Sequence, residues 1–285
     1  MISRGTPTVA AVVPVKDRPE ELRRALQSIL HQRMPADQVV VVDDGSTDPV
    51  DLSWWPAEAP PLTVIRNAEA LGSGEARNVG VAEVVSDWVA FLDSDDQWLP
   101  SHLERVMASA PGAVAVITGY RASYGGDASQ YEVRPNLGRH AHRRLLRLQN
   151  QPVSCTTTAV SVEWFHKVHG FRQPTAPLED FDLVLRLAEL GEVVSVREVT
   201  ALKESGRGDR VYSVARDAAA VPVLMQMHAE ALGADRVAAR RFALRHRLRT
   251  HQSGPSARRR PVWTLVSRAR LDLPRRVTSL ISRRS

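Results

Sequence analysis

Short apolar runs alternate with segments of helical periodicity along the first hundred residues. The runs at residues 8–15, 39–42 and 62–65 are rich in β-branched residues, and each predicts a strand. After the first run, Pro19 opens a segment that has acids in its first turn, which is typical of a helix start. The apolar positions of this segment recur at helical spacing, at Leu22, Ala25, Leu26, Ile29 and Leu30. Strands that alternate with helices predict an α/β fold.

The pattern is less regular further along the chain. Residues 113–120 and 153–160 predict strands, residues 124–127 a hairpin turn, and residues 139–148 a basic helix. A later helix has its apolar face at Leu183, Leu185, Leu187 and Leu190. Cys155, the single cysteine, falls in the second of these strands, where a buried structural thiol is favoured over a nucleophile. One cysteine allows no intrachain disulfide, so a reducing compartment is expected.

An acidic cluster follows the apolar run at residues 88–92. Asp93, Asp95 and Asp96 place three carboxylates within four residues, and packing gains nothing from like charges at the end of a buried strand. A divalent cation resolves the repulsion, because Mg²⁺ and Mn²⁺ prefer carboxylate oxygens and commonly share substrate phosphates. The alternative is a solvated acidic turn that caps a helix starting near residue 100.

A second acidic cluster follows the run at residues 39–42. Asp43 and Asp44 come directly after this run and lead into a glycine turn. In open α/β sheets ligands bind outside the carboxyl ends of the strands, so both clusters are expected to face one crevice. Acids in such a crevice can accept hydrogen bonds from a ribose or a base.

Five motifs in a fixed order complete the pattern. They are VPVKDRPE (13–20), VVVVDDGSTD (39–48), GSGEARNVG (72–80), FLDSDD (91–96) and LEDFDL (178–183). This order resembles the family-2 glycosyltransferases of the GT-A fold, and the resemblance covers roughly residues 8–205. It implies a single mixed, mostly parallel sheet flanked by helices, with a nucleotide-sugar-binding half in residues 1–112 and an acceptor-binding half in residues 113–212.

The resemblance also implies roles for individual residues. Asp44 is similar to the family's acceptor for the nucleotide base, and Asp95 is the best candidate for a metal ligand, with Asp96 as a second. The other substrate-binding candidates are Pro14, Val15, Lys16, Asp17, Arg77, Asn78, Asp93 and Ser94. Asp180 resembles the general base that activates the acceptor hydroxyl, with Glu179 beside it. The alternative for this acidic pair, the start of a helix, does not exclude the role.

These parts imply a metal-dependent enzyme that uses Mn²⁺ or Mg²⁺. It would move a single hexose from a nucleotide-diphosphate sugar to an acceptor hydroxyl, with inversion. The polymerising members' QxxRW signature and transmembrane helices are absent, which argues against a processive synthase. The family's basic leaving-group contact has no histidine counterpart, and Lys203, Arg207 and Arg210 are candidates without an assignment. The sequence names neither the sugar, the base nor the acceptor.

Three other classes were weighed against this interpretation. A dinucleotide oxidoreductase requires a third glycine at the position that Arg77 occupies. A haloacid-type phosphatase requires a nucleophilic aspartate at the position of Val42. A non-catalytic adaptor of the same fold that binds nucleotide sugars is the stronger rival. The retained acidic clusters and the Glu179–Asp180 pair argue against it.

The charge is divided sharply along the 285 residues. Residues 236–285 hold 15 arginines and one acid, a net charge of +14, so the whole-chain charge of +6 leaves −8 for residues 1–235. Residues 213–285 therefore predict a helical, arginine-rich extension. Its mixture of arginines with apolar residues suits an anionic membrane surface, and a flexible solvated tail is the alternative. No nucleic-acid-binding motif accompanies it. We expect a cytoplasmic protein, peripheral at the inner face of the membrane under the first interpretation.

Overall fold

The computed structural model describes residues 6–124, 130–148, 153–173, 175, 177–205 and 214–252. The strands of these residues are β1 (Val9–Val15), β2 (Gln38–Asp43), β3 (Leu62–Arg66), β4 (Trp88–Phe91), β5 (Asp96–Trp98), β6 (Ala115–Tyr124), β7 (Gln130–Val133), β8 (Thr158–Ser161) and β9 (Val193–Ser205). The helices are α1 (Pro19–Leu30), α2 (Ser73–Ala82), α3 (His102–Ala108), α4 (Ala141–Leu146), α5 (Val162–Lys167), α6 (Glu179–Leu190), α7 (Val214–Met227), α8 (Ala229–Ala234) and α9 (Arg236–Gln252).

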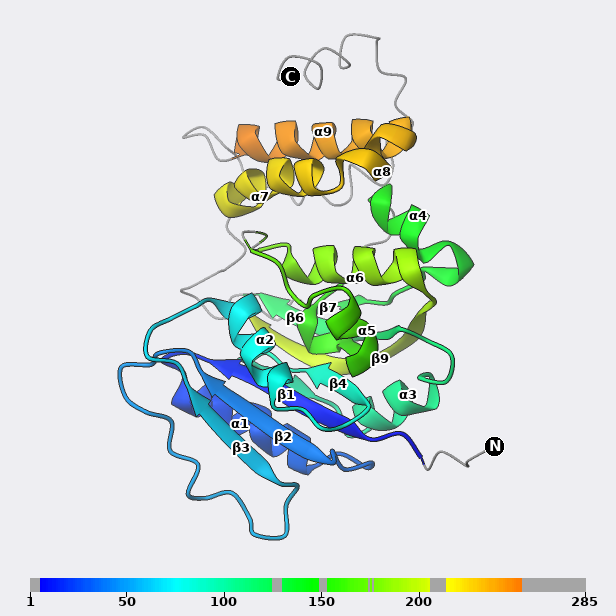
Figure 1. Ribbon diagram of the computed structural model, residues 1–285. Helices are drawn as coiled ribbons and strands as arrows, with labels where there is room; N and C mark the ends of the chain where they lie inside the picture. Colours follow the sequence, from blue (N-terminus) through cyan, green and yellow to red (C-terminus); the bar gives the residue numbers. More distant parts are fainter. Residues whose placement is uncertain are drawn as a thin grey trace.

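The strands of the described residues form one mixed sheet in the order β3-β2-β1-β4-β8-β6-β9-β5, with β7 paired to β6 (Figure 1). β3, β2, β1 and β4 are parallel neighbours, and β6 and β9 are also parallel. β8 is antiparallel to both of its neighbours, and β5 is antiparallel to β9. This confirms the predicted mixed, mostly parallel sheet.

Alternate residues of the central strands face two different cores. Val12, Val40 and Val42 belong to the core that α2 and α6 cover. Val13 and Val41 belong to the opposite core, beneath α1 and α3. Because side chains alternate along a strand, a continuous valine run serves both faces of a sheet that is covered on both sides. This explains why these strands lack polar alternation.

Close packing of α2 on the sheet depends on one glycine of the GSGEARNVG motif. A Cβ atom added to Gly80 would lie 2.6 Å from Val12 Cγ1 and 3.0 Å from Val42 Cγ2. The helix therefore approaches β1 and β2 more closely than any side chain at this position allows. That approach brings the residues of α2 near the carboxyl ends of the strands.

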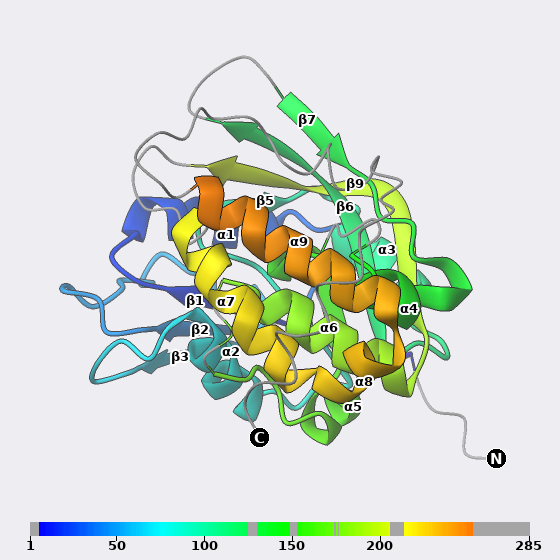
Figure 2. The same ribbon diagram turned by 90° about the horizontal axis from the view of Figure 1, so that it is seen from above.

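The described part of the basic extension is helical. Figures 1 and 2 show α7, α8 and α9 layered over α6, on the side away from β1–β3. Val221, Leu224 and Phe242 are fully buried in the same core as α6, and the ring centroids of Phe242 and Phe181 lie 6.3 Å apart. The sequence prediction of helices here is met to residue 252, and residues 253–285 lie outside the described residues.

Cys155 lies in a short 3₁₀ turn, Cys155–Thr157, and the strand predicted around it is confined to Thr158–Ser161. The Ser154 carbonyl oxygen accepts hydrogen bonds from the Thr157 N–H (3.0 Å) and from two threonine hydroxyls, of Thr157 (3.2 Å) and Thr158 (2.8 Å). Such local bonds compete with strand pairing, which is why the apolar pattern was misleading here. The thiol is buried as predicted, and burial raises its pKa.

Of two further predicted elements, the helix differs in extent and the hairpin is found. The basic helix is shorter than residues 139–148, since α4 follows a 3₁₀ turn at Gly138–His140 and ends at Leu146. β6 and β7 pair as an antiparallel hairpin, as a turn at residues 124–127 predicts. Residues 125–129, which connect the two strands, lie outside the described residues.

Candidate active site

Three parallel strands end side by side and deliver the predicted polar segments to one edge of the sheet. Val15 of β1 is opposite Asp43 of β2, and the Asp44 N–H donates to the Val15 carbonyl oxygen at 2.8 Å. On the other side of β1, the Leu92 N–H donates to the Val12 carbonyl oxygen at 3.1 Å. The two acidic clusters therefore lie on either side of the segment that follows β1, as the sequence predicts.

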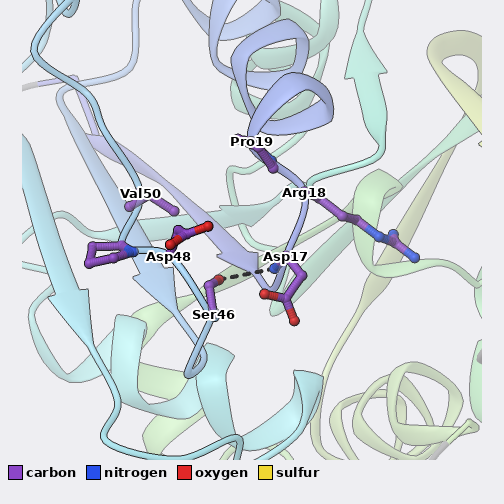
Figure 3. A pocket seen from close by; sticks show the side chains of 7 residues that line it. Asp17, Arg18, Pro19, Ser46, Asp48 and Val50 are labelled. Atoms are coloured by element: carbon purple, nitrogen blue, oxygen red, sulfur yellow. Dashed lines mark hydrogen bonds between the residues drawn. The ribbon is translucent and has the colours of Figure 1, made fainter.

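A pocket of about 210 Å³ opens beside the segment that follows β1 (Figure 3). Its lining residues are Asp17, Arg18, Pro19, Ser46, Asp48, Pro49 and Val50. The Asp17 N–H donates to Ser46 Oγ at 3.0 Å, and the Thr47 N–H donates to Asp17 Oδ1 at 2.7 Å, which lowers the pKa of Asp17. Asp17 has a φ of 51°, an uncommon conformation for a non-glycine residue and one that clusters at functional sites. Lys16 and Asp17 are exposed here, whereas Pro14 and Val15 are buried within β1.

Asp44 is buried and connects β2 to the loop before α2. Its Oδ1 accepts hydrogen bonds from Asn67 Nδ2 and the Leu71 N–H, both at 2.8 Å, and its Oδ2 accepts from the Gly72 N–H at 2.9 Å. These contacts fix the loop that leads into the GSGEARNVG motif. Sequence reasoning missed Asn67, whose position one residue after β3 gave no signal of this contact.

Each carboxylate of the DSDD cluster has a cationic partner. Asp93 Oδ1 lies 2.5 Å from Arg77 Nη2, and Asp95 Oδ2 lies 2.5 Å from Arg18 Nη1. The third, Asp96, is paired with Lys203, which sequence reasoning had named among three unassigned candidates. Arg207 and Arg210, the other two, lie outside the described residues.

Lys203 brings β9 to the acidic cluster. Its Nζ lies 2.7 Å from Asp96 Oδ2, 3.4 Å from Asp93 Oδ2 and 2.8 Å from Ser154 Oγ. Burial alone would lower the pKa of Lys203, but Asp96 and Asp93 outweigh burial and raise it. Asp96 also accepts from Thr156 Oγ1 at 2.5 Å and from the Glu204 N–H at 3.2 Å. Both oxygens of Asp96 therefore have protein donors.

The three aspartates have different pKa shifts. Burial raises the pKa of Asp96 to about 6 although Lys203 opposes the shift, and burial together with Asp93 raises the pKa of Asp95. Burial acts to raise the pKa of Asp93 as well, but Arg77 and Lys203 hold it below its usual value. Asp93 is thus a permanent anion between two cations. Ser94, between Asp93 and Asp95, is buried.

The acidic pair that opens α6 faces the DSDD cluster across Arg77. Glu179 Oε1 accepts from Ser73 Oγ at 2.8 Å and lies 3.7 Å from Arg77 Nη1. Arg77 is only 4% exposed, and its Nε and Nη1 have no hydrogen-bond partner among the described residues, nor has Glu179 Oε2. Buried polar atoms without hydrogen-bond partners are rare in folded proteins, so this group is a candidate for contact with a ligand or ion.

Asp180 is buried beside this group. Burial raises its pKa to about 7, and the negative charge of Glu179 adds to the shift. The Phe181 N–H, which donates to Asp180 Oδ1 at 2.7 Å, opposes it, as do the charges of Arg77 and Lys203. A carboxyl group with a pKa near neutrality can take up and release a proton at physiological pH.

Asn78 is hydrogen-bonded within α2 and to the loop before α6. Its Nδ2 donates to Glu75 Oε2 and to the Phe171 carbonyl oxygen, and its Oδ1 accepts from the Phe171 N–H, all at 2.9 Å. Asn78 therefore attaches the loop before α6 to α2. Sequence reasoning had placed it with Arg77 at the nucleotide.

The donor set fits a divalent metal at Asp95 better than at Asp96. No three His, Cys, Asp or Glu side chains converge on one point among the described residues, so protein atoms alone do not make a complete site there. Mg²⁺ commonly uses one or two carboxylates and completes its coordination with phosphates and water. The side chain of Asp95 is 33% exposed and that of Asp96 is 3% exposed. To bind a phosphate-bound ion, Asp95 would have to break only one ion pair, the one with Arg18.

Comparison with known proteins identifies the family. Residues 10–168 match the model of glycosyl transferase family 2. The chain is 28% identical over 184 residues to an uncharacterized glycosyltransferase of Haemophilus influenzae, which covers 64% of this chain and 62% of that protein. It is 32% identical over 199 residues to the pre-mycofactocin glycosyltransferase of Mycobacterium tuberculosis, covering 64% of this chain and 39% of that protein. The chain thus spans less than two thirds of the length of both relatives.

Two solved structures share the fold. One is Staphylococcus aureus TarS in complex with UDP-GlcNAc, with a TM-score of 0.64 at 18% identity, over 87% of this chain and 73% of that chain. The other is the mannosyltransferase PcManGT of Pyrobaculum calidifontis in complex with GDP-Man and Mn²⁺, with a TM-score of 0.60 at 19% identity, over 92% and 79% of the two chains. With a family match over more than half of the chain and two acidic clusters at the ends of the strands on either side of β1, this protein belongs to glycosyl transferase family 2.

Proposed function

We propose that this protein transfers a single hexose from a nucleotide-diphosphate sugar to an acceptor hydroxyl, with inversion at the anomeric carbon. The observation that carries the proposal is Asp180, a buried carboxyl group with a pKa of about 7 beside the cations of the DSDD cluster. A base that is tuned to neutrality and lies next to anion-binding side chains is what attack by a hydroxyl on a phosphorylated sugar requires.

The donor would lie along the carboxyl ends of β1, β2 and β4. The pocket beside Asp17 and Ser46 suits the base and ribose, because the exposed carboxylates of Asp17 and Asp48 can accept hydrogen bonds from N–H and O–H groups. Asp44 supports this region through the loop before α2. Arg77, two of whose nitrogens have no hydrogen-bond partner among the described residues, and Lys203 would supply positive charge for the diphosphate. Residues 1–112 are then the donor half and residues 113–212 the acceptor half.

Inversion requires one direct displacement. Asp180 accepts the proton of the acceptor hydroxyl as its oxygen bonds to the anomeric carbon, while the bond from that carbon to the diphosphate oxygen breaks. Arg77 and Lys203 stabilise the negative charge that develops on the leaving diphosphate. A Mn²⁺ or Mg²⁺ ion, held by Asp95, would supply Lewis-acid stabilisation of the same charge. Glu179 keeps the pKa of Asp180 high and orients the start of α6 through Ser73.

A panel of nucleotide sugars tests the proposal. UDP-, GDP- and dTDP-sugars are screened by thermal shift with and without Mn²⁺, and the stabilising donors are then incubated with simple alcohols and sugars. We expect at least one donor to raise the melting temperature and to release its nucleoside diphosphate. Stabilisation without release of any nucleoside diphosphate would favour the alternative, a non-catalytic adaptor that binds nucleotide sugars.

Replacement of Lys203 should destabilise the fold in a pH-dependent way. Lys203→Met leaves Asp93 and Asp96 without their shared cation, and loss of one partner of a buried ion pair costs about 3–5 kcal/mol. Lys203 holds down the pKa of Asp96, which burial raises to about 6, so this pKa should rise further in the variant. The variant then continues to lose stability above pH 6, where this group no longer destabilises the wild type further, and the deficit should grow there. Urea unfolding at pH 5 and pH 8, followed by tryptophan fluorescence, measures it.

The exposed Lys167 offers a matched control for this prediction. Lys167→Met removes the same charge from the surface together with a cation–π contact to Trp164 (4.0 Å), so it should cost about 0.5–1 kcal/mol, equally at pH 5 and pH 8. A Lys203→Met deficit that is equally large at pH 5 and pH 8 would show that Asp96 is not the group that Lys203 neutralises.

The basic extension indicates the place in the cell where the protein binds its acceptor. No helix of the described residues is long and apolar enough to span a bilayer. We propose that residues 253–285, with nine arginines and one acid, attach the enzyme to the anionic cytoplasmic surface of a membrane. The net charge of −8 on residues 1–235 makes the body of the protein unsuited to that surface.

Deletion of residues 253–285 should abolish membrane attachment and leave turnover of a water-soluble acceptor unchanged. Binding is measured by sedimentation with phosphatidylcholine vesicles that contain or lack phosphatidylglycerol. Each basic residue near the surface contributes about 1 kcal/mol, so the loss should be large at low salt and should shrink as salt is raised. Equal sedimentation of the full-length and shortened proteins would refute the proposal.

A further inference from the structure

A second buried acid of α6, Asp182, lies at the centre of a charged cluster that the proposed chemistry does not use. Asp182 is fully buried, and its carboxylate accepts from Arg172 Nε (3.0 Å) and Nη2, from Arg186 Nε (2.9 Å) and from His228 Nε2 (2.8 Å). Burial acts to raise the pKa of Asp182, but these donors hold it well below its usual value. A carboxylate has about four acceptor positions, so this one is saturated.

The three donors come from three parts of the chain. Arg186 lies one turn further along α6, and Arg172 lies in the connection between α5 and α6. His228 joins α7 to α8 and is only 8% exposed. Figures 1 and 2 show these C-terminal helices layered over α6. Asp182 therefore connects the helical extension to the loop that precedes the proposed base.

That loop, residues 168–172, is attached on both sides. Arg186 Nη1 donates to the Val168 carbonyl oxygen at 2.5 Å and Nη2 to the Gly170 carbonyl oxygen at 2.7 Å. On the other side, the amide of Asn78 exchanges two hydrogen bonds with the Phe171 backbone. Gly170 has a φ of 59°, and a Cβ atom there would lie 2.5 Å from Asn78 Oδ1, so the contact with α2 depends on glycine.

The 168–172 loop also contacts the proposed donor site. The Phe171 ring lies with its centroid 5.5 Å from the guanidinium carbon of Arg77 and 5.3 Å from the ring of Phe91, at the end of β4. Arg77 in turn pairs with Asp93 and lies near Glu179. A displacement of the loop would therefore move the Phe171 ring, which packs against Arg77, the cation that we assign to the diphosphate.

We propose that His228 is a positioning residue, which holds the 168–172 loop against Arg77 by fixing Asp182 and Arg172 from the C-terminal helices. These helices then act as a support for the active site and are required for turnover even when the acceptor is soluble. The kinetic part of this inference rests on the proposed transferase function, whereas the structural part does not.

Amide hydrogen exchange of the full-length protein tests the structural part. His228→Met keeps apolar bulk and removes the donor to Asp182. We expect the amides of Gly170 and Phe171, both hydrogen-bonded in the structure, to exchange about tenfold faster or more, while amides of β1 and β4 are unchanged. His228→Gln, which can still donate to Asp182, should restore slow exchange. Should His228→Met fail to fold, Arg172→Met removes the loop's own donors and must give the same acceleration.

A matched control separates this role from general loosening of the helices. Arg147→Gln breaks the 2.6 Å ion pair between Arg147 and Asp235, which joins α4 to the same C-terminal helices without contacting the loop. It should leave exchange of the 168–172 loop unchanged. Unaltered exchange in His228→Met, or equal acceleration in Arg147→Gln, would overturn the inference.

Release of nucleoside diphosphate from UDP-GlcNAc and GDP-mannose tests the kinetic part. For His228→Met we expect kcat to fall about tenfold with a donor KM within about threefold of the wild type, since misplacement by an ångström can cost up to 10²-fold in rate. His228→Gln should recover most of the rate. If the wild type turns over neither donor, the proposed function fails for these donors, and the exchange measurement still decides the role of His228. Unchanged kcat in His228→Met would overturn the link to turnover.

Discussion

Asp180→Asn should lower turnover by at least about 10²-fold, because the amide keeps the size of the side chain but cannot take a proton, and a positioned base contributes 10²–10⁴-fold. Donor affinity should barely change, since we assign the donor to Arg77, Lys203 and Asp95. Steady-state kinetics and a calorimetric titration of the donor measure both quantities. Loss of donor binding in proportion to turnover would show that Asp180 holds the donor.

The wild-type enzyme should also show the pKa of this base in its pH profile. Asp180 acts as its carboxylate, so kcat/KM should rise with pH and level off above about 7, the pKa of Asp180 in the free protein. Glu179, Arg77, Lys203 and Cys155 are the charged or titratable groups that interact with it, and the first of these keeps the value high. Residual turnover of Asp180→Asn should lack this rise.

The contribution of Asp180 to stability should fall with rising pH, whereas activity should increase. A carboxyl group whose pKa is raised on folding binds more protons in the folded state, so the contribution of Asp180 to stability falls as the pH rises from about 4 to about 7. Asp180→Asn removes this fall and should be more stable than the wild type at pH 8. Glu179→Gln should reduce turnover less, since Glu179 acts by orienting α6 and by its charge. If Glu179→Gln abolishes turnover and Asp180→Asn retains it, Glu179 is the base.

Asp95→Asn should abolish detectable transfer. The substitution removes the charge of the most accessible carboxylate in the DSDD cluster, and with it the proposed ligand for Mn²⁺ or Mg²⁺. The stabilisation that Mn²⁺ adds to donor binding in a thermal shift assay should disappear, while stabilisation by donor alone remains. Near-normal turnover of this variant would show that Asp95 is not the metal ligand that transfer requires.

Glu132→Gln is the matched control for Asp95→Asn. Glu132, on β7, pairs with Arg121 and Arg134 and is outside the proposed site, so its neutralisation should leave the Mn²⁺ effect intact. Asp96→Asn gives a further comparison. Because its carboxylate holds Lys203, this change should mainly lower stability and leave part of the Mn²⁺ effect. A complete loss of the Mn²⁺ effect in Asp96→Asn alone would show that Asp96, and not Asp95, is the metal ligand.

The sequence predicted those parts of the site that lie within single motifs. The valine run at residues 39–42 and the acids after it established a buried strand that ends at a polar edge, and the structure confirms that strand. Local patterns carry this information, because strand burial and turn chemistry depend on neighbouring residues. The same reasoning failed at Cys155, where hydroxyl groups of adjacent threonines bond to the Ser154 carbonyl and shorten the strand.

Contacts between distant motifs could not be predicted in the same way. Nothing in the sequence around Lys203, the single lysine of β9, marks it as a partner of Asp96, and the pairing follows from the antiparallel register of β5 and β9. His228 and Asp182 likewise meet only because the C-terminal helices pack on α6. Such pairs depend on tertiary packing, and no local periodicity of a single sequence predicts them.

The pairing of Lys203 with Asp96 also has a consequence for how the chain is made. The two residues are separated by 107 positions, so Asp96 leaves the ribosome roughly 5–20 s before its counter-charge, at 5–20 residues per second. During that interval Arg77 and Arg18 are already available to Asp93 and Asp95, but Asp96 has no cation and β5 lacks its partner β9. The DSDD segment therefore completes its fold late, after synthesis has passed β9, and until then it is an open edge that a chaperone can bind.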